Sequence, residues 1–287
     1  MAFPRSTLAV IVLIASLSAV VHAKKASCTY DTFDVPSQYT LSTVEGIGDD
    51  GTVVGQVIDN KTQLPMGFMR SPNGTITVYS APQSTTTWMN GQNATGTSAG
   101  YYLDKTAKVH GFTLENGNFN AINYPKGANT WIFGVNHVGA LVGSYGGAGS
   151  VKGFLLVNGQ YTTVAQSGQQ LTYPMAVNDN NAAVGYSASG FVDNGFLWQN
   201  GKFTNINFPN SKFGTILSGI NNAGVIVGNH ISADKAWGFI YENGAFKTLA
   251  YTGAYYITAG GINNNGVISG QVYSTAKNSL GFTATCK

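Results

Sequence analysis

A ten-residue stretch recurs along this chain at nearly constant spacing, and it constrains the fold more than any other feature. Its most regular copy begins at Gly219 and reads Gly-Ile-Asn-Asn-Ala-Gly-Val-Ile-Val-Gly. Copies begin at residues 46, 91, 134, 176, 219 and 261, so consecutive starts lie 45, 43, 42, 43 and 42 residues apart. A period in this range is typical of a solenoid, a propeller or another repeat array.

Each repeat unit contains the signals for four short β-strands. In the copy that begins at Gly219, residues 222–224 predict a tight turn, because Asn and Gly tolerate positive φ. The apolar run 225–227 predicts a strand that is buried on both faces. A Gly-Phe pair at residue 238 begins a third strand, and the hairpin signal Asn243-Gly244 leads into a fourth. Four strands in about 42 residues match one blade of a β-propeller, whereas a parallel β-helix normally has shorter coils.

The repeat unit is incomplete at both ends of the chain, and the two partial units complement each other. The last copy stops at Lys287, directly after its third strand. The segment Tyr30–Pro36 has the pattern of a fourth strand, with apolar residues six and three positions before its proline. We therefore expect residues 28–36 to pair with residues 281–286. This closure predicts an all-β, six-bladed propeller in which the N-terminal strand completes the last blade; an open solenoid would need polar caps instead.

The two cysteines of the chain, Cys28 and Cys286, both lie in the segments that we expect to pair. Aligned with complete units, they occupy the two turn positions that join a third strand to a fourth. A disulfide between them would replace the covalent turn that the split blade lacks. Two free buried thiols are the alternative.

The first residues have the features of a secretory signal peptide. Arg5 precedes an apolar run from Leu8 to Val21, and Val21-His22-Ala23 is a small-residue cleavage site. Cleavage after Ala23 would give a secreted chain of residues 24–287 that forms one domain, extracellular or periplasmic. An uncleaved anchor is the alternative. The apolar run is too short to span a membrane, and no later stretch predicts a span in the mature chain.

The charge of the chain limits the classes of partner. Only 9% of its residues are charged, and 15 Lys and Arg residues stand against 12 Asp and Glu residues. A nearly balanced charge without a basic run argues against nucleic acid as a partner. No motif indicates a cofactor.

The repeat unit resembles the HAF family of extracellular repeats. The best match is the run from Gly195 to Phe203, which reads Gly-Phe-Leu-Trp-Gln-Asn-Gly-Lys-Phe. The His-Ala-Phe that names the family is approached only by His110-Gly111-Phe112. The resemblance covers roughly residues 28–286. It implies repeat architecture and secretion, and it implies no activity or catalytic residues.

Three aromatic residues are candidates for ligand binding. Trp88, Trp131 and Tyr173 each lie three residues before a repeat start. In a propeller this places them near the face that carries the variable loops, where binding sites are usual. Exposed there, they would stack on sugar rings. Their alternation with the position of Ile220 predicts instead that they pack between blades.

Two carboxylates are candidates for catalysis. Asp59 and Asp104 lie four residues after Gly55 and Gly100, the last glycines of their ten-residue stretches. They should therefore occupy equivalent loops of neighbouring blades. A pair of carboxylates facing a cleft could serve glycoside hydrolysis. Two solvated loop residues beside Lys61 and Lys105 are the alternative.

The polar turns suggest structure before chemistry. Asp49-Asp50-Gly51 and Asp179-Asn180-Asn181 occupy the tight-turn positions of their repeats, and we interpret them as turns. The histidines at 110, 137 and 230 belong to three different blades and do not predict a metal site.

The sequence thus predicts a secreted, non-catalytic binding module, with a polysaccharide or a surface protein as its expected ligand. The alternatives are a carbohydrate-active enzyme, either a glycosidase or a lyase, that uses Asp59 and Asp104, and a structural envelope protein.

Overall fold

The computed structural model describes residues 23–125, 129–232, 235–275 and 278–287, and within these ranges the chain is built from β-strands and their connections. The expected signal peptide, residues 1–23, lies outside the described residues except for Ala23. No helix in the described part of the chain has the length and apolar character needed to cross a membrane.

Antiparallel pairing groups the strands into sets of four, and we call each set a blade, named after its first strand. The first three blades are β3 (Tyr39–Ile47), β4 (Val53–Asp59), β5 (Pro65–Arg70) and β6 (Ile76–Tyr79); β7 (Ser84–Gln92), β8 (Ser98–Asp104), β9 (Val109–Glu115) and β10 (Asn118–Ile122); and β11 (Asn129–Val135), β12 (Leu141–Gly147), β13 (Ser150–Val157) and β14 (Gln160–Val164).

The chain continues in the same order of strands. The next two blades are β15 (Leu171–Val177), β16 (Ala183–Ala188), β17 (Asp193–Gln199) and β18 (Lys202–Asn205); and β19 (Thr215–Ile220), β20 (Ile226–Ser232), β21 (Lys235–Glu242) and β22 (Ala245–Thr248). The last blade consists of β23 (Tyr256–Ile262), β24 (Val267–Thr275), β25 (Asn278–Cys286) and, from the other end of the chain, β2 (Cys28–Phe33).

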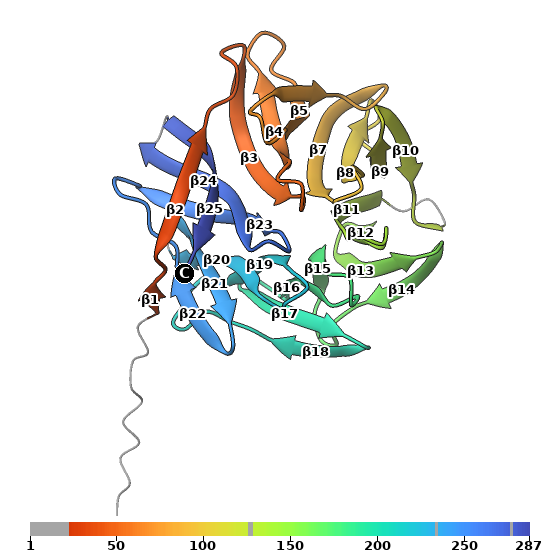
Figure 1. Cartoon of the computed structure of the whole chain (residues 1–287). Helices are drawn as coiled ribbons and strands as arrows, with labels where there is room; N and C mark the ends of the chain where they lie inside the picture. Colours follow the sequence, from red (N-terminus) through yellow and green to blue (C-terminus); the bar gives the residue numbers. More distant parts are fainter. Residues whose placement is uncertain (1–22, 126–128, 233–234, 276–277) are drawn as a thin grey trace, which may run out of the picture.

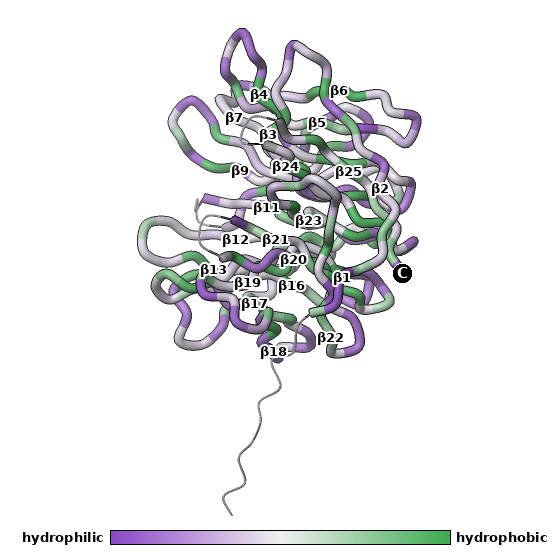
Figure 2. The backbone as a smooth tube through the Cα atoms, turned by 90° about the vertical axis from the view of Figure 1, so that its left-hand side faces the viewer, coloured by the Kyte–Doolittle hydropathy of each residue, from purple (hydrophilic) through white to green (hydrophobic). Residues whose placement is uncertain are grey.

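The blades are arranged around a common axis, with the first strand of each blade innermost (Figure 1). Short parallel contacts join some neighbouring blades, such as the single pair Val151–Leu171 between β13 and β15. Hydrogen bonding therefore gives four continuous sheets, two of four strands, one of eight and one of nine. In the side view of Figure 2, hydrophobic stretches follow the strands and many connecting loops are hydrophilic.

The expected closure of the last blade is confirmed. Strand β2 pairs antiparallel with β25 from Cys28–Cys286 to Phe33–Gly281, and the two cysteines form a disulfide. The sequence did not predict strand β1 (Lys24–Lys25), which adds in parallel to the outer strand β22 of the preceding blade. The N-terminal segment therefore holds two blades together.

The repeat glycine at the start of each second strand makes room for the core. A Cβ added to Gly100 would lie 1.9 Å from the carbonyl oxygen of Trp88 and 3.0 Å from the ring of Phe112. Because no side chain intervenes, the phenylalanine of the Gly-Phe pair on each third strand packs directly on the neighbouring strand. All of these phenylalanines are completely buried: Phe68, Phe112, Phe154, Phe196, Phe239 and Phe282.

A buried asparagine at the end of the first strand links each blade to the next. Asn136 donates from Nδ2 to the carbonyl oxygen of Asn178 at 3.0 Å, and its Oδ1 accepts the N–H of Ala140 at 2.8 Å. The same donor bond to the next blade recurs at Asn93, Asn178, Asn221 and Asn263. One side chain thus closes its own turn and fixes the neighbouring blade. The β3 blade is the exception, because Gly48 accepts from Asn263 and has no side chain with which to donate.

We predict that removal of the disulfide lowers stability strongly. The bridge joins residues 258 positions apart, for which the chain-entropy model gives an upper value of about 5 kcal/mol. We therefore expect Cys28→Ser with Cys286→Ser to lower the melting temperature by about 10 °C, as measured by differential scanning calorimetry. Ser27→Ala serves as the control. A double variant that melts with the wild-type protein would contradict the stapling role.

We predict that Asn136→Ala weakens the contact between two blades. The change leaves the N–H of Ala140 without its partner in a buried site, at a cost of about 1–3 kcal/mol. It also removes the bond between the blades to the carbonyl of Asn178, which keeps only the N–H of Asn181. The midpoint of urea unfolding should fall accordingly. The matched control is Asn180→Ala, in an exposed position of the following turn. Equal midpoints for the two variants would refute the linking role.

Candidate functional site

A polar pocket lies on the axis of the ring, and bulges in the first strands create it. In each blade the register of the first strand shifts at the residue before the start of the ten-residue repeat, for example between Ile132 and Gly134. A bulge leaves its extra residue outside the ladder and re-aims its side chain. The skipped residues that line the pocket are Glu45, Asn90, Phe133, Met175 and Ser218.

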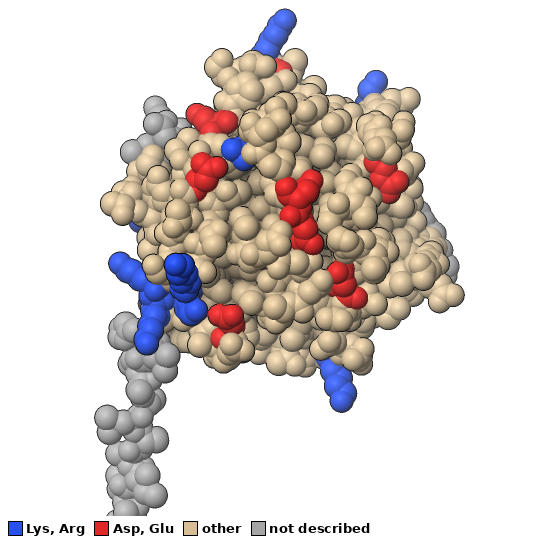
Figure 3. All heavy atoms as spheres, viewed as in Figure 1, with Lys and Arg blue, Asp and Glu red and all other residues tan. Residues whose placement is uncertain are grey.

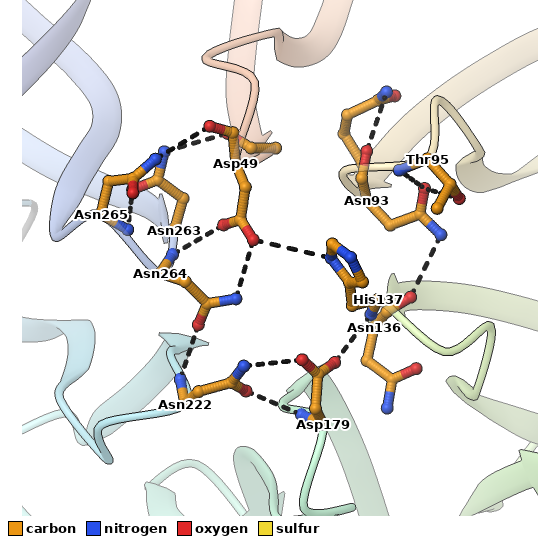
Figure 4. A network of polar contacts seen from close by, with 12 residues as sticks. Asp49, Asn93, Thr95, Asn136, His137, Asp179, Asn222, Asn263, Asn264 and Asn265 are labelled. Atoms are coloured by element: carbon orange, nitrogen blue, oxygen red, sulfur yellow. Dashed lines mark hydrogen bonds and ion pairs between the residues drawn. The ribbon is translucent and has the colours of Figure 1, made fainter.

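The rim of this axial pocket is a ring of hydrogen-bonded side chains from the tight turns (Figure 4). The N–H of His137 donates to Asp179 Oδ1 at 2.8 Å, and the N–H of Asp179 donates to Asn222 Oδ1 at 2.9 Å. The N–H of Asn222 donates to Asn264 Oδ1 at 2.8 Å, and that of Asn264 to Asp49 Oδ1 at 2.7 Å. The second residue of each turn therefore binds its counterpart in the next blade.

The ring of turn contacts is interrupted in the β7 blade. Ala94 occupies the position there and has no polar side chain. The imidazole of His137 reaches across this gap, with its Nδ1 3.7 Å from Asp49 Oδ2. The rim is therefore asymmetric, although the backbone repeats.

The axial pocket is small and acidic. It encloses about 90 Å³, room for about three water molecules at their liquid volume. Among the described residues that line it, the carboxylates are Glu45, Asp49 and Asp179, and none is Lys or Arg. Figure 3 shows acidic groups near the middle of the face and most basic groups toward its edge. Such a pocket favours a hydrogen-bond donor or a cation over an anion.

Glu45 is the carboxylate that lies deepest along the first strands. Its surroundings raise the pKa of this carboxyl, mainly because burial disfavours the charged form. The carboxylate in turn helps to raise the pKa values of Tyr101 and Tyr273, for which burial is the larger cause. Two phenols therefore lie within electrostatic reach of one carboxylate, a combination that is typical of functional sites.

Aromatic side chains from three adjacent blades form a continuous wall around one side of the axis. Trp88 stacks on Tyr101 with ring centroids 4.9 Å apart, and Tyr101 meets the ring of Phe133 edge-on at 6.0 Å. Phe133 meets Tyr173 edge-on at 6.1 Å, and Tyr173 stacks on Tyr186 at 5.0 Å. All five side chains are only partly exposed. We call these residues the aromatic wall.

The other side of the axis has small, polar or aliphatic residues at the corresponding positions. Thr43, Ile216 and Thr258 replace the aromatic residues of the first strands, and Gln56, Asn229 and Gln271 replace those of the second. Asn229 bonds both to the carbonyl and to the N–H of Ala259. An apolar wall thus faces hydrogen-bonding groups and Glu45 across the axis.

The structure places two of the predicted binding residues in the aromatic wall and corrects the alternation inferred for them. The bulge between Trp131 and the next repeat glycine reverses the alternation, so this position no longer shares a face with the buried Ile220 position. Trp88 stacks on Tyr101 of its own blade, and Tyr173 meets Phe133 of the neighbouring blade edge-on. Trp131 is half-buried at the equivalent position, pairs with Ser144 in register, and has no aromatic partner within the described residues.

Asp59 and Asp104 are each bound within their own loop. Asp59 Oδ1 accepts the N–H groups of Lys61 and Thr62 and the hydroxyl of Thr62. Asp104 accepts the N–H and hydroxyl of Thr106 and contacts His110 Nε2 at 3.2 Å. Hydrogen bonds lower the pKa of both carboxyls. A general acid needs the opposite shift.

The remaining histidines have structural surroundings. His110 contacts Asp104 and Asn123, and His230 stacks on Phe208 with centroids 4.0 Å apart. Within the part of the chain that is described, no three His, Cys, Asp or Glu side chains converge as a metal site.

Sequence reasoning missed the axial pocket because the repeat hid it. The tight turns look uniform, but their second residue varies among Asp49, Ala94, His137, Asp179, Asn222 and Asn264. The residue before each repeat start varies as well, and this is the bulged position. These two variable positions within an otherwise regular repeat were the signal that could have predicted the axial pocket.

The fold of the chain has counterparts among solved structures. No family model matches the chain, and no curated protein sequence matches it. The crystal structure of AofleA from Arthrobotrys oligospora is similar, with a TM-score of 0.58, 13% identity, and coverage of 90% of this chain and 86% of that one. TolB from Acinetobacter baumannii gives a TM-score of 0.55 at 11% identity, covering 86% and 80%.

A third similar structure is that of an enzyme. Virginiamycin B lyase from Staphylococcus aureus, crystallised as an inactive variant with quinupristin, gives a TM-score of 0.52 at 12% identity, covering 90% and 99%. Identities this low carry the fold alone. The chain therefore has a β-propeller fold.

Proposed function

We propose that this protein is a secreted carbohydrate-binding module on a six-bladed β-propeller, and that the aromatic wall is its binding surface. The observation that carries the proposal is the unbroken run of rings from Trp88 to Tyr186, which spans three adjacent blades on one side of the axis. Sugar rings have apolar faces that stack on aromatic side chains, and their hydroxyl groups need hydrogen-bonding partners.

The opposite side of the axis supplies those partners. Glu45 lies close enough to Tyr273 and to Tyr101 of the wall for electrostatic coupling, so a carboxylate and a further phenol accompany the wall. A carboxylate accepts hydrogen bonds from hydroxyl groups, and a phenol both donates and accepts. We assign Glu45 the role of accepting from a ligand hydroxyl, and no catalytic role.

The blade count, the family and the location belong to the same proposal. Each set of four strands is counted as one blade, which gives six blades with β2 completing the last. The repeat unit supports membership of the HAF family. The Cys28–Cys286 disulfide is of a kind that persists in oxidising compartments, and together with the expected signal peptide it supports secretion.

We predict that binding depends on the aromatic wall. Purified residues 24–287 would be applied to an array of glycans and cell-wall polymers, followed by calorimetric titration of any hit. Trp88→Ala and Tyr173→Ala should each weaken binding by about tenfold or more. Trp131→Ala tests the third predicted residue.

The matched control is Trp237→Ala, a half-buried tryptophan on the third strand of its blade and so away from the axis. Melting temperatures of all variants separate lost binding from lost folding. A folded wild-type protein that binds no glycan would refute the proposed function, as would equal loss in Trp237→Ala.

We predict that Glu45 makes stability depend on pH in a defined direction. Because its pKa is raised in the folded state, that state holds the proton more tightly than the unfolded state. Stability from this group is therefore greatest at low pH and falls as pH rises from the usual carboxyl pKa through the raised one.

The variant Glu45→Gln removes this dependence. Its melting temperature should exceed that of the wild-type protein at neutral pH. The difference should shrink below about pH 4, where the carboxyl of Glu45 is protonated in both the folded and the unfolded protein. Differential scanning fluorimetry over this pH range measures both. Asp59→Asn, at an exposed loop carboxylate whose pKa is lowered, should show the opposite trend. Parallel curves for wild type and Glu45→Gln would contradict the assignment.

A further inference from the structure

Exposed apolar side chains gather on neighbouring loops at one part of the molecule. Among the described residues the large hydrophobic side chains with high exposure are Phe191 at 100%, Val192 at 46%, Phe213 at 46%, Tyr255 at 47%, Leu64 at 46% and Val138 at 71%. The first four belong to loops of three consecutive blades. We call these four residues the apolar rim.

Backbone contacts hold the loops of the apolar rim together. The N–H of Asp193, which follows Val192, points to the carbonyl oxygen of Phe213 at 3.5 Å. The N–H of Phe213 donates in turn to the carbonyl of Ile231 at 3.4 Å. Lys235 lies four residues after Ile231, and its Nζ is 3.7 Å from the ring centroid of Tyr255. The rim is therefore one connected surface.

The apolar rim adjoins the aromatic wall but is distinct from it. The Asp193 carboxylate helps to raise the pKa values of Tyr173 and Tyr186, after burial as the larger cause for each, so the rim begins beside the end of the wall. The side chains of the apolar rim are exposed to solvent, whereas those of the wall are only partly exposed. Large apolar side chains exposed together on adjoining loops suit contact with another molecule.

Lysines accompany the apolar side chains. Lys212 is exposed and directly precedes Phe213, and Lys235 lies over Tyr255. An aromatic side chain beside a lysine suits the boundary between lipid headgroups and acyl chains, where the ring enters the apolar layer and the ammonium meets anionic headgroups.

We propose that the apolar rim attaches the protein to the surface of a lipid bilayer with anionic headgroups. The rim consists of separate side chains at loop tips, and Phe191 is fully exposed. A protein partner would need a matching pocket for each tip, whereas a lipid interface accommodates any spacing. A second copy of the chain, related by a two-fold axis, would bring the same lysines to both sides and repel.

Vesicle co-sedimentation of residues 24–287 tests the proposal. One set of vesicles is phosphatidylcholine alone, and the other is phosphatidylcholine mixed with phosphatidylglycerol. We expect binding to the anionic vesicles that weakens as salt is added. Phe191→Ser with Phe213→Ser should reduce the bound fraction at least tenfold, and Lys212→Gln with Lys235→Gln should remove the preference for phosphatidylglycerol.

The control is Leu64→Ser with Val138→Ser, which removes the two exposed apolar side chains outside the rim. It should bind vesicles as the wild-type protein does. Absence of wild-type binding, or equal loss in this control, would overturn the proposal. A dimer in sedimentation velocity that Phe191→Ser and Phe213→Ser dissolve, without vesicle binding, would overturn it in favour of a second copy. None of these outcomes depends on Trp88, so the test is independent of glycan binding.

Discussion

The amide of a buried asparagine, present in every blade except the β3 blade, holds this ring together. Its oxygen closes the turn of its own blade while its nitrogen reaches the next, so local and long-range structure rely on the same side chain. At the point where the ring closes, Asn263 donates to Gly48, 215 residues away, at 3.0 Å. The relay runs in one direction around the axis and ends at Gly48, which cannot pass it on. Each blade except the β7 blade is therefore positioned by its predecessor through this bond, and Asn263 of the last blade fixes the first.

Because repeated positions hold the blades together, the residues that face the axis can differ from one blade to the next. The buried asparagines and the repeated glycines hold the blades against one another. The bulged residues and the second turn residues are therefore not needed for this packing. The chain uses this freedom unevenly: rings fill one side of the axis from Trp88 to Tyr186, and the other side carries Glu45 and amides. Function in a repeat protein is expected at such departures from the repeat.

The sequence predicted the repeat, the strand order and the pairing of Cys28 with Cys286, because period and turn chemistry are local signals. It did not predict the bulge before each repeat glycine, because one extra residue in a ladder leaves no mark in the spacing of the repeats. That omission reversed the inferred orientation of Trp88 and Tyr173. The hairpin signals were also uneven: Asn200 and Gly201 both have positive φ, as a two-residue turn requires, whereas at Asn73-Gly74 only the glycine does.

The disulfide has a mechanical consequence. Cys28 and Cys286 stand opposite each other at the outer edge of the last blade, and nearly the whole chain lies between them. A pull applied through the segments outside these two residues would first load the pairing of β1 with β22. Beyond Cys28 the force passes along the disulfide to Cys286 and bypasses the strands between them. The hydrogen bonds between β2 and β25 would bear that force only after reduction. In its oxidised form the closure of the last blade is therefore protected from tension between the two ends.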